Sequence, residues 1–136
     1  MEIRVFFRIS LADREKTSNC VGKFAISKTD TIYNVTLKIE HRKKWKCDEG
    51  ALVELKFEDN SVINIKTKSK SESKHNSTGA GDFYENYGDI IIELDNNSLL
   101  NLKSKKLTKI RVTLEEGFAI CDVKSDNVLK YCKCIQ

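Results

Sequence analysis

The segment Leu107–Val123 constrains the fold of this chain more than any other, because its side chains alternate along both halves of a hairpin. A two-residue turn at Glu116 and Gly117 puts three apolar pairs on one face. These pairs are Leu114 with Ala119, Val112 with Cys121, and Ile110 with Val123. The other face then carries a cross-strand charge pair, Arg111 with Asp122. Successive strand side chains point to opposite faces, so a slip of one residue would destroy both patterns.

The composition of the chain limits the classes of protein to which it can belong. The chain has 136 residues, which suits one domain with one core, and we expect a single β-rich domain over residues 1–136. With 40% hydrophobic and 32% charged residues it is far from a disordered composition. No run approaches the roughly 20 apolar residues that span a bilayer. The net charge of +4 indicates only a loose attraction to anions.

Alternation of apolar and polar residues predicts further strands. These are Glu2–Ile9, Val21–Ser27, Thr31–Glu40 and Asp89–Leu94. A second hairpin is expected over Ala51–Thr67, where a three-residue loop of Asp59, Asn60 and Ser61 keeps the apolar residues on one face. This loop would place Phe57 opposite Ile63 and Leu55 opposite Ile65.

Two short helices are also expected. Ser98 has the side chain of an N-cap before the leucines of SLLNL, and Ser125 could cap a last helix. Val128, Leu129 and Cys132 have helical spacing and would dock on the sheet. The predicted fold is therefore mainly β: an antiparallel β-sandwich or partly open barrel of about eight strands with two short helices.

The long polar segment 68–87 has few aliphatic residues and ends in three aromatics, Phe83, Tyr84 and Tyr87. Connections of this length are uncommon in compact domains unless they are functional or disordered. Aromatics on such a loop either contact a partner or close the loop onto its own sheet, and both readings stay open. We take these three residues as the candidate partner-binding site.

A basic stretch with one aromatic suggests a second kind of site. Cations that neutralise phosphates, together with a ring on which bases stack, are typical of polyanion binding. The candidate residues are Arg42, Lys43, Lys44, Trp45, Lys46, Lys68, Lys70 and Lys74. The same composition also fits a solvated loop whose tryptophan is anchored in the core.

Reaction chemistry has little support in the sequence. The two histidines, His41 and His75, lie in polar links, and no catalytic constellation, cofactor motif or metal-ligand spacing is present. Cys132 and Cys134 with Cys47 and His41 have the atoms for zinc but not the usual paired spacing. Five cysteines and an N-terminus without a secretory pattern favour a reduced, cytoplasmic protein. Removal of a leader would instead indicate export, with Cys20 or Cys47 available for a disulfide.

Several segments after Ala51 carry a resemblance. The order of VINIKT, a polar loop with glycine, DIIIEL, SLLNL and KKLTKIRV resembles uncharacterised small β-rich proteins common in gut Bacteroidetes, over Ala51–Ile135. The matching residues are structural, such as Asp59, Leu102 and Ile110 to Val112. The resemblance implies the fold and, because many such proteins are exported, the exported alternative. It implies no activity.

The sequence therefore predicts a non-catalytic interaction or structural module without a cofactor. Its partner would be another protein or a second copy, bound through a sheet edge or the 68–87 loop. The alternative is a nucleic-acid or polyanion binder acting through the basic 42–46 and 68–74 segments.

Overall fold

A computed structural model of the chain describes residues 3–12, 17–41, 44–75, 86–123 and 126–134. Eleven strands and two helices lie within these ranges. The strands are β1 Ile3–Ala12, β2 Thr17–Thr29, β3 Ile32–His41, β4 Lys46–Cys47, β5 Leu52–Phe57, β6 Val62–Lys66, β7 Ser71–Glu72, β8 Lys74–His75, β9 Asn86–Leu94, β10 Leu107–Thr113 and β11 Phe118–Asp122. The helices are α1 Asn96–Ser104 and α2 Asn127–Cys132.

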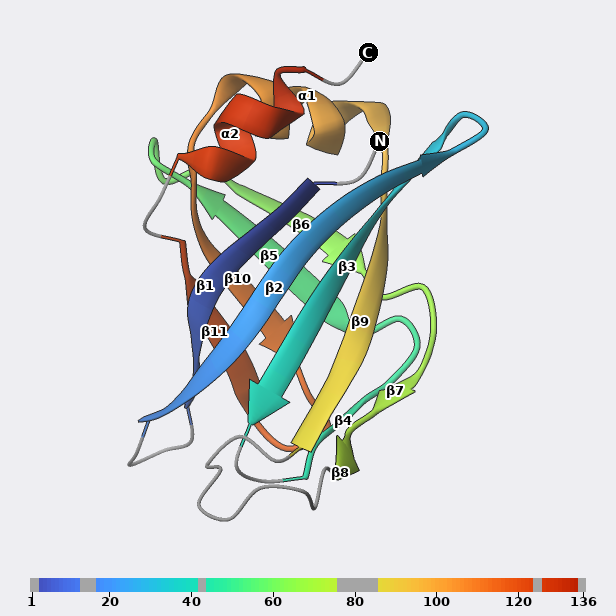
Figure 1. Cartoon of the computed structure of the whole chain (residues 1–136), viewed down its shortest axis with the longest axis vertical. Coiled ribbons are helices and arrows are strands. Elements are labelled where there is room, and N and C mark those ends of the chain that lie inside the picture. The colour runs from blue at the N-terminus through green and yellow to red at the C-terminus, as the bar shows by residue number, and fades with distance from the viewer. Residues whose placement is uncertain (1–2, 13–16, 42–43, 76–85, 124–125, 135–136) are drawn as a thin grey trace.

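Nine strands form one antiparallel sheet in the order β6-β5-β10-β11-β1-β2-β3-β9-β8, and β4 pairs with β7 separately. The sheet folds back on itself (Figure 1). A front layer of β1, β2, β3 and β9 faces a back layer of β6, β5, β10 and β11, with both helices across one end. The prediction of a mainly β, antiparallel fold with two short helices is confirmed. Apart from three two-residue strands, eight described strands remain, as expected.

The hairpin β10–β11 confirms the predicted faces but not the predicted register. Val112 lies opposite Ala119, and Ile110 lies opposite Cys121, each two residues from the expected partner. The loop is Glu115 and Glu116, because the Leu114 N–H donates to the Gly117 carbonyl at 3.0 Å. Gly117 has φ +88°, a conformation that glycine adopts readily after such a turn. A shift of two residues leaves every side chain on its original face.

One consequence is that the predicted pair of Arg111 with Asp122 is wrong. In the observed register Arg111 lies opposite Ile120 on one side and Glu54 on the other. Its Nη2 donates to Glu54 Oε1 at 2.6 Å. The cation is therefore neutralised by β5 rather than by its own hairpin.

The hairpin β5–β6 has a three-residue loop, as predicted, but it is shifted along the chain. The loop is Glu58, Asp59 and Asn60, so Leu55 lies opposite Ile63 rather than Ile65. Asn60 has φ +68°, which an asparagine tolerates well. The Asp59 carboxylate accepts hydrogen bonds from the N–H and the hydroxyl of Ser61, at 3.0 and 2.5 Å. These local hydrogen bonds stabilise the loop at Glu58–Asn60 rather than at Asp59–Ser61.

Helix α1 is capped by Asp95, whose carboxylate accepts from the Ser98 N–H at 2.7 Å. The prediction of Ser98 as the N-cap is therefore wrong, and Ser98 is a buried residue inside the helix. Helix α2 follows Asp126, while Ser125 lies outside the described residues. Val128 and Cys132 are buried, and α2 packs on α1 and β1, so the predicted docking face is confirmed for these two residues.

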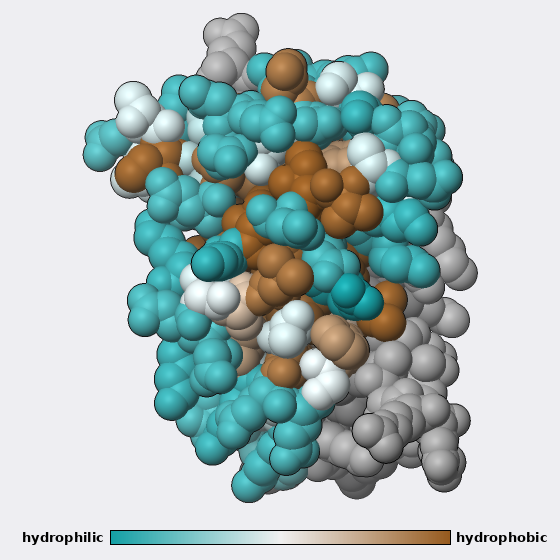
Figure 2. Space-filling view, turned by 180° about the vertical axis from the view of Figure 1, so that it is seen from behind, coloured by the Kyte–Doolittle hydropathy of each residue, from teal (hydrophilic) through white to brown (hydrophobic). Residues whose placement is uncertain are grey.

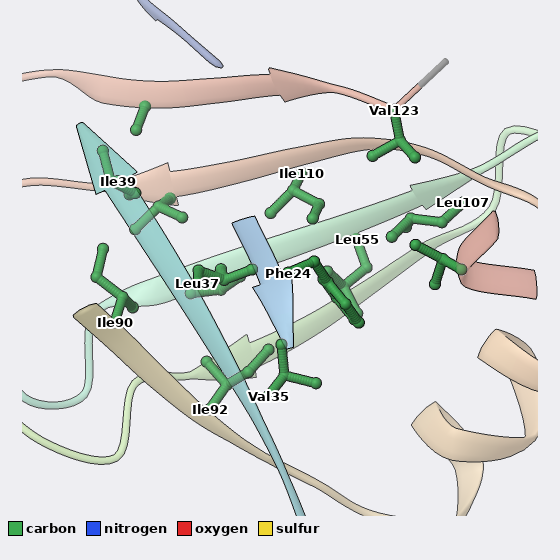
Figure 3. Close-up of a cluster of buried hydrophobic side chains, with 14 of the residues drawn as sticks. Phe24, Val35, Leu37, Ile39, Leu55, Ile90, Ile92, Leu107, Ile110 and Val123 are labelled. Atoms are coloured by element: carbon green, nitrogen blue, oxygen red, sulfur yellow. The ribbon is translucent and has the colours of Figure 1, made fainter. Parts of the chain in front are cut away.

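The core fills the space between the two layers. Phe24, Leu37 and Ile90 point inward from the front layer, toward Leu55 and Ile110 of the back layer (Figure 3). All five side chains are fully or almost fully buried. Burial of one such side chain contributes about 1.5–3 kcal/mol, so this cluster stabilises the whole sheet.

Candidate functional site: an open sheet edge

Strand β6 ends the nine-stranded order, and no ladder joins it to the other layer within the described residues, although one end of β6 lies close to β9. Thr67, directly after β6, forms an isolated antiparallel bridge with Ile92 of β9. The Lys68 N–H extends this contact by donating to the Ile91 carbonyl at 2.8 Å. The stretch Val62–Ile65 precedes this bridge and forms the open edge, the name we use for it below.

The direction of the backbone along the open edge follows from two hydrogen bonds. The Phe57 N–H donates to the Ser61 carbonyl at 3.0 Å, and the Thr67 N–H donates to the Ala51 carbonyl at 2.9 Å. In an antiparallel pair every second residue exchanges backbone bonds with its neighbour, so Ile63 and Ile65 also bond to β5. Val62 and Asn64 therefore direct their N–H and C=O groups away from β5.

The side chains at the open edge are less buried than those beside them. Ile63 and Ile65 face the core, but they are only half-buried, whereas Val53 and Leu55 opposite them on β5 are fully buried. Val62 on the outer face is 49% exposed. Figure 2 shows that apolar side chains gather on this rear face within a polar surround. Apolar side chains beside backbone groups that are directed away from the sheet are what an added strand would cover.

One end of the open edge is fastened by Thr67, which is buried. Its hydroxyl donates to the Asp48 carbonyl at 2.6 Å and accepts from the Ala51 N–H at 3.0 Å. Its own carbonyl accepts from the Gly50 N–H at 3.0 Å. Thr67 thus holds the turn before β5 and the contact with β9 at the same place.

The other end is fastened to the segment after α1. Lys105 Nζ lies 2.8 Å from Asp59 Oδ2 and 3.3 Å from Ser61 Oγ. The Glu58 N–H donates to the Lys106 carbonyl at 2.9 Å. The hydrogen bonds from Lys105 and Ser61 hold the pKa of Asp59 well below its usual range, so this carboxylate stays charged. The open edge is therefore anchored at both ends.

Beside the open edge, the outer face of the back layer is rich in cations. The Arg111 guanidinium that pairs with Glu54 also lies over the ring of Phe118, 4.8 Å from its centroid. Phe118 is 38% exposed. Lys66 on β6 and Lys109 on β10, the strands on either side of β5, are exposed. Arginine stacked on an exposed aromatic is a combination common in protein interfaces.

The predicted aromatic site can be placed only in part. Phe83 and Tyr84 lie outside the described residues. Tyr87 lies on β9, where it pairs with Lys74 of β8 and is 38% exposed. Tyr87 is therefore part of a strand rather than of the loop predicted to end with it.

The two predicted basic segments are brought together by the pairing of β4 with β7, which sets Lys46 opposite Glu72. Lys44, Lys46, Lys68, Lys70 and Lys74 are exposed, while Arg42 and Lys43 lie outside the described residues. Trp45, however, is 5% exposed and packs on Gly88, where an added Cβ would lie 2.9 Å from the ring. Its ring is thus anchored in the core, as in the alternative of a solvated loop with a buried tryptophan. It is not available to stack on a base.

The cysteines with described side chains are free thiols: Cys47, Cys132 and Cys134. Cys47 on β4 and Cys132 on α2 lie at opposite ends of the molecule (Figure 1). Burial raises the pKa of both thiols to about 11, which makes them poor nucleophiles at neutral pH. Among the described residues no three potential ligands are grouped as a metal site.

Comparisons with protein-family models, curated proteins and solved structures found no match. The resemblance to β-rich proteins of gut Bacteroidetes therefore stays a prediction. Neither described helix is long and apolar enough to cross a membrane. Val62 and Asn64, whose outward backbone defines the open edge, were not among the residues predicted from the sequence. No local pattern marks them, because the end of a sheet is decided by long-range pairing.

Proposed function

We propose that this domain is a non-catalytic protein-interaction module that binds an extended segment of a partner protein along the open edge. The observation that carries the proposal is the backbone of Val62 and Asn64, which is directed away from β5. An added strand would bond to these groups and continue the antiparallel order of the sheet.

The half-buried isoleucines supply the second part of the interaction. Two outward residues offer four backbone groups, and one net hydrogen bond contributes only about 0.5–1.5 kcal/mol. Burial of apolar surface on Ile63 and Ile65 would add to this, at roughly 25 cal/mol for each Å². The expected complex is one in which side-chain packing decides which segment binds.

A proline at Asn64 tests the proposal, because it removes the outward N–H without touching a bond to β5. Proline is tolerated on edge strands for this reason. An unbiased peptide-display selection on the wild-type protein should enrich extended peptides that bind Asn64→Pro at least about tenfold more weakly. Asn64→Ala is the matched control: it keeps the N–H and should bind the same peptides as the wild type.

Circular dichroism and thermal melting of all three proteins would show that the fold is retained. Equal binding of the selected peptides to Asn64→Pro, or a selection without any enriched peptide, would refute strand addition at this edge.

The second candidate function is polyanion binding, and the joining of the two basic segments by β4 and β7 favours it. Retention on heparin should then fall steeply with salt, since each neutralised charge releases a counterion. The double variant Lys46→Ala with Lys70→Ala should elute at lower salt than the wild type. No retention at low salt would remove this candidate.

We also propose a cytoplasmic location. The free thiols of Cys47 and Cys132 support it, since a reducing compartment keeps such groups unpaired. Fractionation of the cells that make the protein, with a blot of each fraction, tests this point, and recovery outside the cytoplasm would contradict it.

A further inference from the structure

We infer that the open edge selects its partner protein by one residue, a β-branched aliphatic residue that lies opposite Ile63. This inference rests on the proposed function and adds the chemistry of the bound segment. It is carried by the position of Ile63 between the two outward residues of β6 and by the approach of β9 at one end of the open edge.

Ile63 lies in the middle of the site. Val62 and Asn64, on either side of it, direct their backbone groups away from β5, so an added strand would bond at these two positions. The residue between them would form a non-hydrogen-bonded pair with Ile63. Such pairs bring the two Cα atoms to about 4.5 Å, against about 5.5 Å in hydrogen-bonded pairs. The side chain opposite Ile63 would therefore pack closely against it, on the face that points toward the core.

The next inward residue, Ile65, has less room beside it. Thr67 bridges Ile92 of β9. Two residues further toward the start of β6, the same register would set Ile65 opposite Leu94, the last residue of β9. Strand β9 therefore limits the approach of an added strand at this end, although no ladder forms there within the described residues. The approach is widest beside residues 62–64, which hold a single inward position.

The inward position favours an apolar partner residue. Ile63 is half-buried, whereas Leu55 opposite it on β5 is fully buried, so part of the Ile63 side chain still contacts water. A charged side chain placed against it would lose water without gaining a hydrogen bond. Alanine would leave most of the exposed apolar surface uncovered. Valine and isoleucine cover it, and β-branched residues also suit the strand conformation and cross-strand packing.

The outward positions, in contrast, lie among charges of both signs. Lys66 and Glu93 are both exposed, and the bridge beside them sets them at facing positions of β6 and β9. On the outer face of β5, Glu54 pairs with Arg111, and Lys56 is half-buried. Charges of this kind near the surface are screened at physiological salt. We therefore expect the outward residues of a partner to contribute little selectivity by their charge.

Three cyclic hairpin peptides test the inference. Each is closed by a disulfide and presents one free strand, with threonine at the outward positions and isoleucine, alanine or glutamate at the inward position. A preformed hairpin loses less conformational entropy on binding than a linear peptide. We expect the isoleucine hairpin to bind the wild-type protein at least about tenfold more tightly than the other two, as measured by NMR titration of the Val62 and Asn64 N–H signals.

Matched truncations in the protein locate the selectivity. Ile63→Ala should reduce the preference for isoleucine over alanine to less than about threefold. Ile120→Ala is the control, because it truncates a half-buried isoleucine on β11, away from the open edge, and should keep the full preference. Thermal melting would show that both variants fold. Isoleucine hairpins with glutamate or with lysine at the outward positions should have affinities within about threefold of each other at physiological salt.

The outcomes distinguish the inference from the proposed function. Equal binding of the three hairpins that is lost in Asn64→Pro would overturn the selection by one residue and leave strand addition standing. A preference that persists in Ile63→Ala would overturn it as well. If no hairpin binds the wild type, the inference fails, and the peptide-display selection alone decides the proposed function.

Two further results would point to other occupants. Binding of the hairpin with outward glutamates alone, unaffected by Asn64→Pro and displaced by heparin, would overturn both proposals in favour of polyanion binding. Sedimentation that shows a dimer of the wild type and a monomer of Asn64→Pro would identify a second copy as the occupant and overturn the inference.

Discussion

The two layers of this molecule meet along two sides, and the two sides are joined very differently. On one side β1 pairs with β11 over five residue pairs, from Arg8 with Asp122 to Ala12 with Phe118. On the other side, in the part of the chain that the structure describes, β6 and β9 form no ladder. They approach each other at one end, where Thr67 after β6 bridges Ile92 and the Lys68 N–H donates to the Ile91 carbonyl. We call these the closed side and the open side.

The difference indicates where a sheet of this kind can bind a partner strand. In a complete ladder, the backbone N–H and C=O groups between two strands bond to each other and cannot bind a partner. A strand at the end of a sheet, in contrast, directs half of its N–H and C=O groups outward. Here the end strand is short, charged at Lys66 and anchored at both of its ends. These features limit self-association and keep the open edge in place for a partner.

The largest expected contrast comes from the same truncation on the two sides. Ile110→Ala removes a fully buried side chain from the closed half of the core and should lower the free energy of unfolding by about 3–4 kcal/mol. Ile63→Ala at the open edge should cost about 1 kcal/mol, because its side chain is only half-buried. Urea unfolding followed by fluorescence measures both, and equal costs would contradict the distinction between the two sides.

The next effect concerns the residue that fastens the open side. Thr67→Val keeps the shape of the side chain but removes its bonds with Asp48 and Ala51, so we expect a loss of about 2–3 kcal/mol. Thr36→Val is the matched control, since Thr36 lies on the outer face of β3 and should change stability by less than about 0.5 kcal/mol. A loss in Thr67→Val no greater than in the control would mean that Thr67 does not hold the open side.

The two hairpins also show which features of the fold could be predicted from the sequence. Alternation correctly assigned the faces of both hairpins, because the period of two fixes which side chains point inward. It misplaced both registers by two residues, because a shift of two leaves the faces unchanged. The deciding features were turn conformations: φ +88° at Gly117 and φ +68° at Asn60.

The candidate site was harder to predict for a different reason. A binding edge was expected, but which strand ends the sheet depends on the pairing of β1 with β11 and of β3 with β9, across long stretches of chain. Local alternation carries no information on such pairing. The partner of Arg111 was missed for the same reason, since Glu54 is 57 residues away in the sequence.

The smallest expected effect concerns the reactivity and ionisation of the cysteine thiols. At pH 8, iodoacetamide should label the exposed Cys134 quickly, and Cys47 and Cys132 only after unfolding, as mass spectrometry of peptides would show. Because the folded pKa of about 11 lies above the ordinary value of 9.0, these thiols stabilise the fold below pH 9. This contribution is lost as the pH rises from 9 to 11. Rapid labelling of Cys47 in the folded protein would contradict its burial.

The most direct test of the open edge is amide hydrogen exchange resolved by residue along β6. The N–H groups of Ile63 and Ile65 bond to β5, so they should exchange at least about 100-fold more slowly than those of Val62 and Asn64. Alternating protection of this kind is the predicted result. Uniform slow exchange from Val62 to Ile65 would contradict the account, because it would mean that the outward groups already have partners.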